Sequence, residues 1–257
     1  MKIAPDTTVC VANAEAVSLE LDVAASAELS TVLLLPRFGE PSVITLNGGA
    51  FDFPLLAAPN EVVVEWRTSG SDEAAFKNRV EVVTRHYFTL DQIKEYGGGS
   101  DDFGSLGDDA LYMARQAATE VFEQAAHRSF VKRIGRTKDY GNGELLVLEH
   151  HDVQALLTDG YRHASDSQLE RMPGYGPFPR FAEYVYGADA MPAEVSRAVL
   201  ELAAYTLRPS NRPIGATGES TDAGYIHFTT AGRDGATAIP EVNAAIEQFG
   251  AGVRFVW

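Results

Sequence analysis

Hydrophobic and polar residues alternate along much of the first 88 positions, and this period of two predicts β-strands. The segment "VSLELDV" places four apolar residues on one face: Val17, Leu19, Leu21 and Val23. The segment "EVVVEWRT" does the same with Val62, Val64 and Trp66. The segment "RVEVVTRHYF" continues the pattern with Val80 and Val82. We therefore expect one apolar face per strand, with Trp66 in the core between the strands.

About seven such strands, separated by Gly, Pro and Asn, predict a small β-sandwich of immunoglobulin-like type over residues 1–88. A short helix is expected next, because Thr89 and Gln92 have the spacing of a capping box. The stretch "GGGSDDFGSLGDD" after it is rich in Gly and Asp and lacks periodicity. Residues 89–107 are thus predicted to be a short helix and a linker between two domains.

Beyond the linker, apolar residues recur every three or four positions, which is the period of an α-helix. A helix over 108 to about 127 is predicted by an apolar stripe: Leu111, Ala114, Ala118, Val121, Phe122 and Ala125. A second helix starts near Pro192, with five apolar residues on one face: Val195, Ala198, Val199, Leu202 and Ala203. The segment "IPEVNAAIEQF" predicts a short last helix over 239–249.

Between the first two helices, the sequence predicts a β-hairpin. The strands "SFVKRIGRTKDY" and "ELLVLEHH" flank Asn142–Gly143, a dipeptide typical of tight turns. Segment 160–190 is predicted to be irregular, and 209–238 to be a long loop. The fold class is therefore α+β with several domains: an immunoglobulin-like sandwich (1–88), a short helix and linker (89–107), a mainly helical core with a hairpin (108–208), and a loop, helix and tail (209–257).

Composition narrows the functional classes. The chain has 36 acidic and 21 basic residues among 257, a net charge of -15, which disfavours broad attraction to phosphate or anionic lipid. Cys10 is the single cysteine, so an intrachain disulfide or a cysteine-rich zinc site is excluded. No apolar run typical of a signal peptide or a membrane span occurs, and we expect no membrane partner.

The sequence contains no motif that is specific for catalysis. His150 and His151 are adjacent, and neighbouring strand residues point to opposite faces, so we expect surface histidines and no metal site. A nucleophile elbow, a Rossmann fingerprint and a phosphate-binding loop are all missing. The expectation is a protein that is not an enzyme, without catalytic residues, metal or cofactor.

The densest basic cluster follows the first long helix: Arg128, Lys132, Arg133, Arg136 and Lys138. One interpretation is a solvated strand, with Phe130 covering the core and Arg128 binding the carbonyl end of the helix. The other interpretation is contact with an acidic partner. Since the chain itself is acidic, a neighbouring copy fits this contact better than nucleic acid does.

The order of signals from about 108 to 257 resembles that of tailed-bacteriophage head-to-tail connector (adaptor) proteins. An Ala-rich helix ends in an Arg-x-Phe element in "AATEVFEQAAHRSFVKR", with Arg128 and Phe130. A segment of the kind "LLVLEHHDVQAL" follows, then the Pro-introduced helix "MPAEVSRAVLELAAY", and finally "GATAIPEVNAAIEQFG". The first 90 residues lie outside this pattern and look like an added sandwich.

The resemblance implies a structural virion protein at the head–tail interface, assembled in the host bacterial cytoplasm. Such adaptors form a ring, usually of twelve copies, beneath the portal, extend the DNA channel without reading sequence, and dock stopper or tail proteins. The basic cluster then supplies subunit contacts. The C-terminal segment supplies candidate portal contacts: Ile239, Val242, Ile246, Phe249, Arg254, Phe255 and Trp257. The alternative is a binding module on a virion or cell surface, in which the sandwich carries a glycan or protein ligand.

Overall fold

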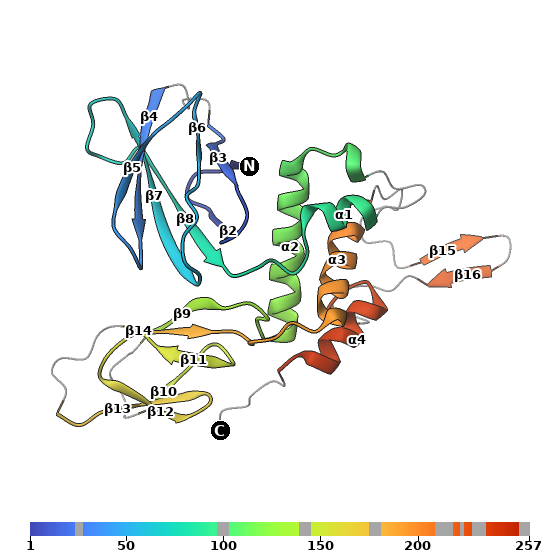
Figure 1. The fold of residues 1–257 in the computed structure, drawn as a ribbon. Coiled ribbons are helices and arrows are strands. Elements are labelled where there is room, and N and C mark those ends of the chain that lie inside the picture. The colour runs from blue at the N-terminus through green and yellow to red at the C-terminus, as the bar shows by residue number, and fades with distance from the viewer. Residues whose placement is uncertain are drawn as a thin grey trace. The chain divides into compact units, whose positions relative to one another are not determined.

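The computed structural model describes residues 1–23, 28–96, 103–138, 145–174, 181–208, 218–221, 224–227 and 235–251. Its contacts divide the chain into two units, each built from separate stretches of sequence. The first unit comprises Met1–His86 and Arg128–Ala190 and contains most of the strands (Figure 1). The second comprises Tyr87–His127 and Met191–Trp257 and contains the long helices. Residues 108–208 are thus shared between the two units.

The N-terminal part of the first unit is a two-sheet β-structure, as its alternating pattern predicts. One sheet has five strands in the order β2-β8-β7-β4-β5. Their bounds are β2 (Thr8–Ala12), β4 (Leu29–Pro36), β5 (Ser42–Thr45), β7 (Asn60–Thr68) and β8 (Phe76–Val83). The other sheet has the order β1-β3-β6, with β1 (Lys2–Ile3), β3 (Ser18–Leu21) and β6 (Ala50–Asp52). The β-rich region is confirmed, and its immunoglobulin-like type stays a prediction.

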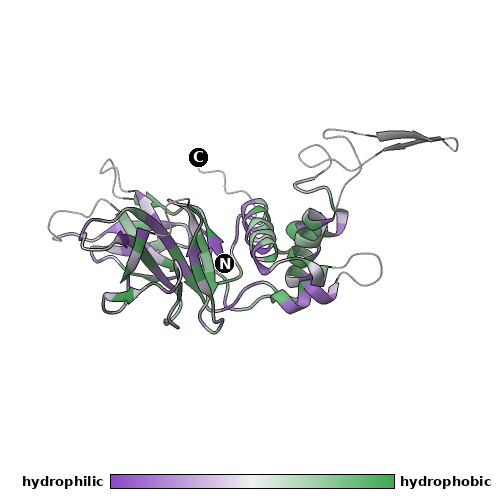
Figure 2. Cartoon of the chain, turned by 90° about the horizontal axis from the view of Figure 1, so that it is seen from above, coloured by the Kyte–Doolittle hydropathy of each residue, from purple (hydrophilic) through white to green (hydrophobic). Residues whose placement is uncertain are grey.

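The core between these sheets holds the residues that alternation placed there. Leu19, Val62 and Trp66 are fully buried. The Trp66 and Phe51 rings form a T-shaped pair with 5.5 Å between centroids, which joins β7 to β6. The indole Nε1–H of Trp66 donates to Asn78 Oδ1 at 3.0 Å, so burial leaves its polar atom satisfied. Figure 2 shows hydrophobic and hydrophilic residues alternating along the strands.

The C-terminal part of the first unit corrects the predicted hairpin and the predicted irregular segment. Strand β9 (Arg133–Lys138) pairs with β14 (Phe181–Tyr186), and β14 also pairs with β11 (Val153–Leu156). Strand β10 (Leu145–Val147) pairs with β13 (Gln168–Arg171), and β13 pairs with β12 (Tyr161–Ser165). The predicted partners β9 and β10 therefore lie in different sheets. Residues Asn142 and Gly143 lie outside the described residues.

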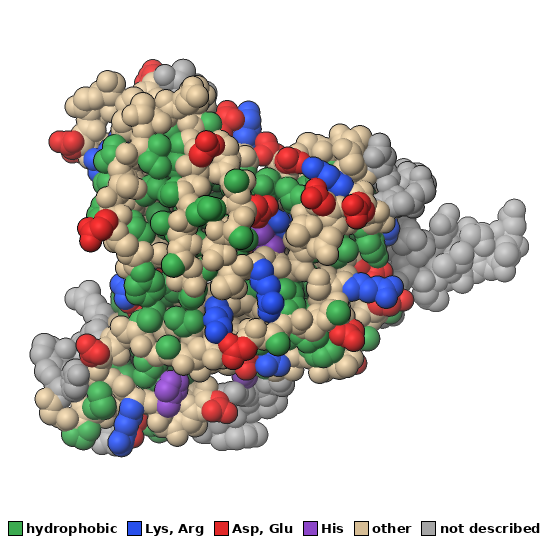
Figure 3. Space-filling view, in the orientation of Figure 1, with side chains coloured by type: hydrophobic (Ala, Val, Ile, Leu, Met, Phe, Trp, Pro, Cys, Tyr) green, Lys and Arg blue, Asp and Glu red, His purple; other side chains and the backbone are tan. Residues whose placement is uncertain are grey.

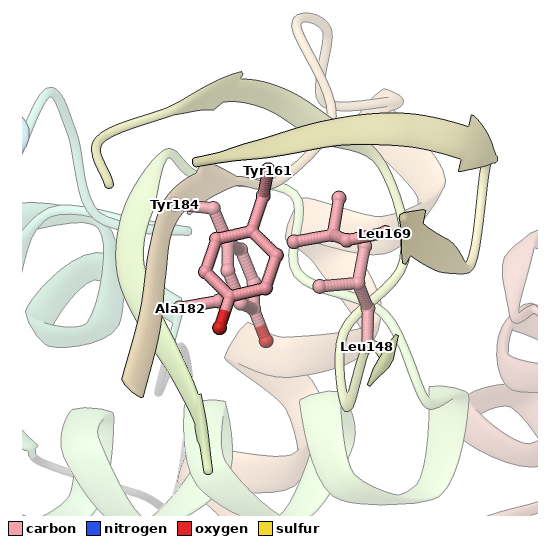
Figure 4. Close-up of a cluster of buried hydrophobic side chains, with 5 residues drawn as sticks. All are labelled: Leu148, Tyr161, Leu169, Ala182 and Tyr184. Carbon is pink, nitrogen blue, oxygen red and sulfur yellow. The ribbon is translucent and has the colours of Figure 1, made fainter. Parts of the chain in front are cut away.

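A small core fills the space between these two three-stranded sheets (Figure 4). It consists of Leu148, Tyr161, Leu169, Ala182 and Tyr184, all buried. Figure 4 shows the rings of Tyr161 and Tyr184 close together, with the two leucines beside them. The sequence period of two in "FAEYVY" places Ala182 and Tyr184 on this face of β14.

The second unit begins with the short helix predicted from the capping box. Helix α1 spans Leu90–Tyr96. The Gln92 N–H donates to Thr89 Oγ1 at 3.2 Å, and the Thr89 N–H donates to Gln92 Oε1 at 2.7 Å. Both halves of the box are therefore formed, which confirms the prediction. A 3-10 turn at Phe103–Ser105 precedes the next helix.

Replacing Thr89 with alanine removes one half of this box. We expect a loss of about 1 kcal/mol in the free energy of unfolding of the second unit, because the Gln92 N–H loses its acceptor. Urea unfolding followed by circular dichroism at 222 nm measures the loss. Thr89→Ser is the matched control and should stay within about 0.3 kcal/mol of the wild type, since it keeps the hydroxyl. Equal stability of all three proteins would contradict the assigned cap.

Three helices form the core of the second unit: α2 (Asp108–Ala126), α3 (Ala193–Leu207) and α4 (Pro240–Phe249). The five apolar residues predicted for the α3 face are all buried. Helix α2 buries Leu111, Ala114, Ala118 and Phe122, as predicted, but Val121 is 44% exposed. Val121 therefore lies outside the buried stripe, which continues instead to Ala126. The remaining described strands, β15 (Gly218–Thr221) and β16 (Gly224–His227), pair with each other.

Polar side chains fix the helices of the second unit to one another. The Tyr87 hydroxyl donates to Glu123 Oε1 on α2 at 2.6 Å, and the Ser196 hydroxyl of α3 donates to the Tyr87 carbonyl at 2.6 Å. Helix α4 contacts both α2 and α3, and the Ala251 N–H after it donates to the Ala126 carbonyl at 2.8 Å. No helix among the described residues is both long and apolar enough to cross a membrane.

Candidate assembly surface

The segment Arg128–Lys138 carries the basic cluster, and its first residue binds a carboxylate. Helix α2 ends at Ala126 and is capped by His127, whose left-handed backbone directs its N–H to the Gln124 and Glu123 carbonyls. The Arg128 guanidinium donates to both carboxylate oxygens of Asp152, at 2.6 and 3.2 Å. It also lies over the Phe130 ring, 5.2 Å from its centroid. Phe130 is buried as predicted, and binding of Arg128 to the carbonyl end of the helix stays a prediction.

The remaining cations of the cluster differ in exposure. The Lys132 ammonium lies 2.7 Å from a carboxylate oxygen of Asp189, and both side chains are more than a third exposed, so the pair contributes little to stability. The Arg133 guanidinium pairs with Glu81 of β8 and is almost fully buried. Lys138, at the end of β9, is exposed. Arg133 is thus the most enclosed cation of the cluster, and Lys138 is exposed.

Arg136 is the centre of a chain of ion pairs that joins β9 to the five-stranded sheet. Its Nε donates to Glu183 Oε1 at 2.6 Å, and its Nη2 lies 3.1 Å from Glu61 Oε2. Glu61 also receives Arg79 Nε at 2.7 Å, and Glu183 also pairs with Arg37. The order Arg37, Glu183, Arg136, Glu61, Arg79 alternates in charge throughout, so each acid contacts two cations.

The electrostatics of Arg136 follow from this arrangement. Burial by itself lowers the pKa of the guanidinium, but the hydrogen bonds and negative charges of Glu183 and Glu61 outweigh it and raise the pKa. The two acids are 10% and 15% exposed at the side chain. Such carboxylates need a paired cation to stay ionised at low cost. The basic cluster therefore neutralises acids of its own chain, and subunit contact by these residues stays a prediction.

The C-terminal candidates fall into three groups. Ile239 and Val242 are buried in the second unit. Ile246 and Phe249 are half-buried on α4. Arg254, Phe255 and Trp257 lie outside the described residues. Ile239 and Val242 thus belong to the core of the helical unit, and portal contact by the whole set stays a prediction.

Sequence reasoning missed a polar cluster around His150, which was expected to be a surface residue. The His150 ring stacks on Tyr186 at 3.9 Å between centroids, and its Nδ1 lies 2.8 Å from the Tyr184 hydroxyl. That hydroxyl lies 2.8 Å from Thr137 Oγ1. On the β9 side, Gly135 leaves room for the Tyr184 ring, because a Cβ there would come within 2.6 Å of it. The only sequence signal was the alternation of Tyr184 and Tyr186.

The surface of the first unit also has an apolar area (Figure 3). Hydrophobic side chains are visible on the face of the five-stranded sheet over β4, β5 and β7. Val43 on the edge strand β5 is 66% exposed, and it pairs in register with the half-buried Leu33. Within the described residues, no group of three or more His, Cys, Asp or Glu side chains is placed to hold a metal ion.

Comparison with known proteins finds solved structures that resemble this chain, but no matching protein family. No protein-family model matches the sequence, and no curated protein matches it. A chain in the neck of an empty gene transfer agent (GTA) particle, computed with C6 symmetry, is 19% identical, with a TM-score of 0.42, over 66% of this chain and 92% of that chain. A chain in the virion of a native gene transfer agent particle is 19% identical, with a TM-score of 0.40 and the same coverage.

Proposed function

We propose that this protein is a structural component of a virion: a head-to-tail adaptor that forms a ring under the portal, extends the DNA channel and docks stopper or tail proteins. The observation that supports the proposal is the order of elements after residue 108. An Ala-rich helix, the Arg128–Phe130 element, a helix introduced by Pro192 and a short last helix follow one another as in the adaptors that the sequence resembles. In this function the chain has no catalytic residue and no cofactor.

The distribution of charge supports a channel wall better than a DNA-binding surface. The chain carries a net charge of -15, and the inner cations of the basic cluster, Arg133 and Arg136, are held by acids of the same chain. These two cations are therefore already paired with carboxylates, which disfavours their binding to DNA phosphates. A wall with excess negative charge repels the DNA backbone and limits adhesion during passage.

Assembly with a portal protein tests the proposal directly. Mixing the purified chain with portal rings of the phage or prophage that encodes it, followed by native mass spectrometry and electron microscopy, should give a complex with one adaptor ring per portal. A chain that stays monomeric and unbound under all assembly conditions, although folded, would contradict the adaptor function.

The C-terminal contact is tested by a short truncation. A chain ending at Ala251 lacks Arg254, Phe255 and Trp257 but keeps α4, whose Val242 is fully buried. We expect portal affinity to fall about 30-fold or more, because aromatic and Arg anchors commonly contribute ~2 kcal/mol or more to an interface. Circular dichroism at 222 nm should be unchanged. Unchanged affinity of the shortened chain would assign portal contact elsewhere.

A second candidate function, binding of a surface ligand by the sandwich, is favoured by the exposed apolar edge at Val43. Glycan and protein arrays with the full chain and with Val43→Glu distinguish the two functions. A ligand that binds the wild type and not the variant supports the surface module. The full chain is required, since Glu61 and Glu81 are paired by Arg136 and Arg133 from beyond the sandwich.

A further inference from the structure

A five-residue segment between β10 and β11 is attached to the first unit at every second residue. Leu148 is buried in the core shared with Leu169 and Tyr184. His150 stacks on Tyr186, and Asp152 binds Arg128. Between these anchors, Glu149 is exposed. Residues 148–152 thus form a strap with three anchors of different chemistry: one apolar, one aromatic and hydrogen-bonded, and one ionic.

The middle anchor depends on a neutral imidazole. His150 Nδ1 and the Tyr184 hydroxyl are 2.8 Å apart, and Thr137 Oγ1 is 2.8 Å from the same hydroxyl. The Glu149 N–H donates to Thr137 Oγ1 at 3.3 Å, which connects the strap backbone to the same network. A neutral ring stacks on Tyr186 without the cost of burying a charge, whereas an imidazolium in this place carries that cost.

The charges that face His150 oppose its protonation. Arg133 faces it from β9, His151 is its neighbour in the strap, and β14 contributes the uncharged phenols of Tyr184 and Tyr186. Glu149, also in the strap, is an acid whose charge acts on Tyr184. Burial, then Arg133 and His151, lower the pKa of His150 from 6.5 to about 4.

We propose that the strap 148–152 is released in acid, and that protonation of His150 is the step that releases it. The strap is closed when the imidazole is neutral. In the open strap the ring is hydrated and takes up a proton at its ordinary pKa. Closure is therefore fully favoured above about pH 6.5 and is weakened as the pH falls towards 4, where the closed form also protonates.

The other two anchors hold the strap by contacts of a different kind. Leu148 has no titratable group, and the Asp152 carboxylate accepts two hydrogen bonds from Arg128. A substitution at His150 therefore tests the middle anchor separately from these two.

The test measures opening and protonation on the full chain. Hydrogen exchange of the Leu148 and Glu149 amides, which donate to Ser167 O and Thr137 Oγ1, reports opening after correction for the intrinsic rate. From pH 7 to pH 4.5 we expect protection to fall about 10- to 60-fold, the upper figure being what a pKa of about 4 in the closed strap and 6.5 in the open strap gives over this range. In NMR spectra, the His150 ring should titrate near pH 4.

A matched pair of variants identifies the group. His150→Asn keeps an acceptor at the position of Nδ1 but cannot be protonated, so its protection should change little over the same range. His151→Asn keeps the His150 ring and should still lose protection in acid, by somewhat less than the wild type, because His151 is one of the groups that lower the pKa of His150. The proposal is overturned if His150 titrates near 6.5 with no loss of protection, or if His150→Asn opens in acid as the wild type does. A misfolded variant leaves the wild-type titration as the deciding measurement.

Discussion

Replacing Arg136 with methionine is expected to lower the free energy of unfolding of the first unit by about 3 kcal/mol. The methionine keeps the apolar stem, so the loss comes from the charge. Removing one partner of a buried ion pair leaves the other uncompensated, at a cost of about 3–5 kcal/mol. We expect a loss at the low end of this range, because Glu61 remains paired with Arg79 and Glu183 remains paired with Arg37. Guanidinium unfolding followed by Trp66 fluorescence measures it, in a Trp257→Phe background.

Lys138→Met is the matched control, because Lys138 belongs to the same strand and is exposed. It should change stability by no more than about 0.5 kcal/mol. The double variant Arg136→Met with Glu61→Gln should lose less than the sum of the two single losses, since the two residues contact each other. An Arg136→Met protein as stable as the wild type, yet unable to form rings, would instead make Arg136 a subunit contact.

The second large effect is expected in the helical unit. Phe122 is fully buried, and the centroid of its ring lies 6.3 Å from that of the Tyr87 ring. Phe122→Ala should therefore lower the free energy of unfolding by about 3–5 kcal/mol, through lost burial and the cavity left behind. Circular dichroism at 222 nm during urea unfolding follows the helices of this unit.

Val121→Ala, one residue earlier, is the matched control and tests the orientation of α2. Val121 is 44% exposed, so its loss should be within about 0.5 kcal/mol. The sequence pattern placed both residues on the buried stripe. Losses of similar size for the two variants would mean that α2 is rotated from the orientation seen here.

Elements with local causes were predictable from the sequence. The capping box of α1 involves residues three apart, and the α3 face repeats every three or four residues, so both were confirmed. Helix α2 was harder, because alanines on several sides of it fit two neighbouring stripes equally well. The β9–β10 hairpin was wrong since β9 pairs with β14, more than forty residues later along the chain. A turn-like dipeptide carries no information about so distant a partner.

The contacts of the candidate site were likewise hard to predict from the sequence, because they join distant segments. The basic cluster was visible in the sequence, but its partners were not, because Glu81 precedes Arg133 by 52 residues and Glu61 precedes Arg136 by 75. His150 was expected on the surface for a similar reason. Its environment is built by β9 and β14, and a pair of adjacent histidines gives no sign of it.

The path of the chain between its two units has a consequence during synthesis. The first unit is left at His86, re-entered at Arg128 and completed at Ala190. On the ribosome the sandwich therefore emerges with Glu61 and Glu81 still lacking Arg136 and Arg133, while the whole first part of the helical unit is made. Domains normally fold in the order of their synthesis. Here the first unit can be completed only after Tyr87–His127 of the second unit has been made. Until then the nascent sandwich lacks the basic strand that pairs with its acidic side chains.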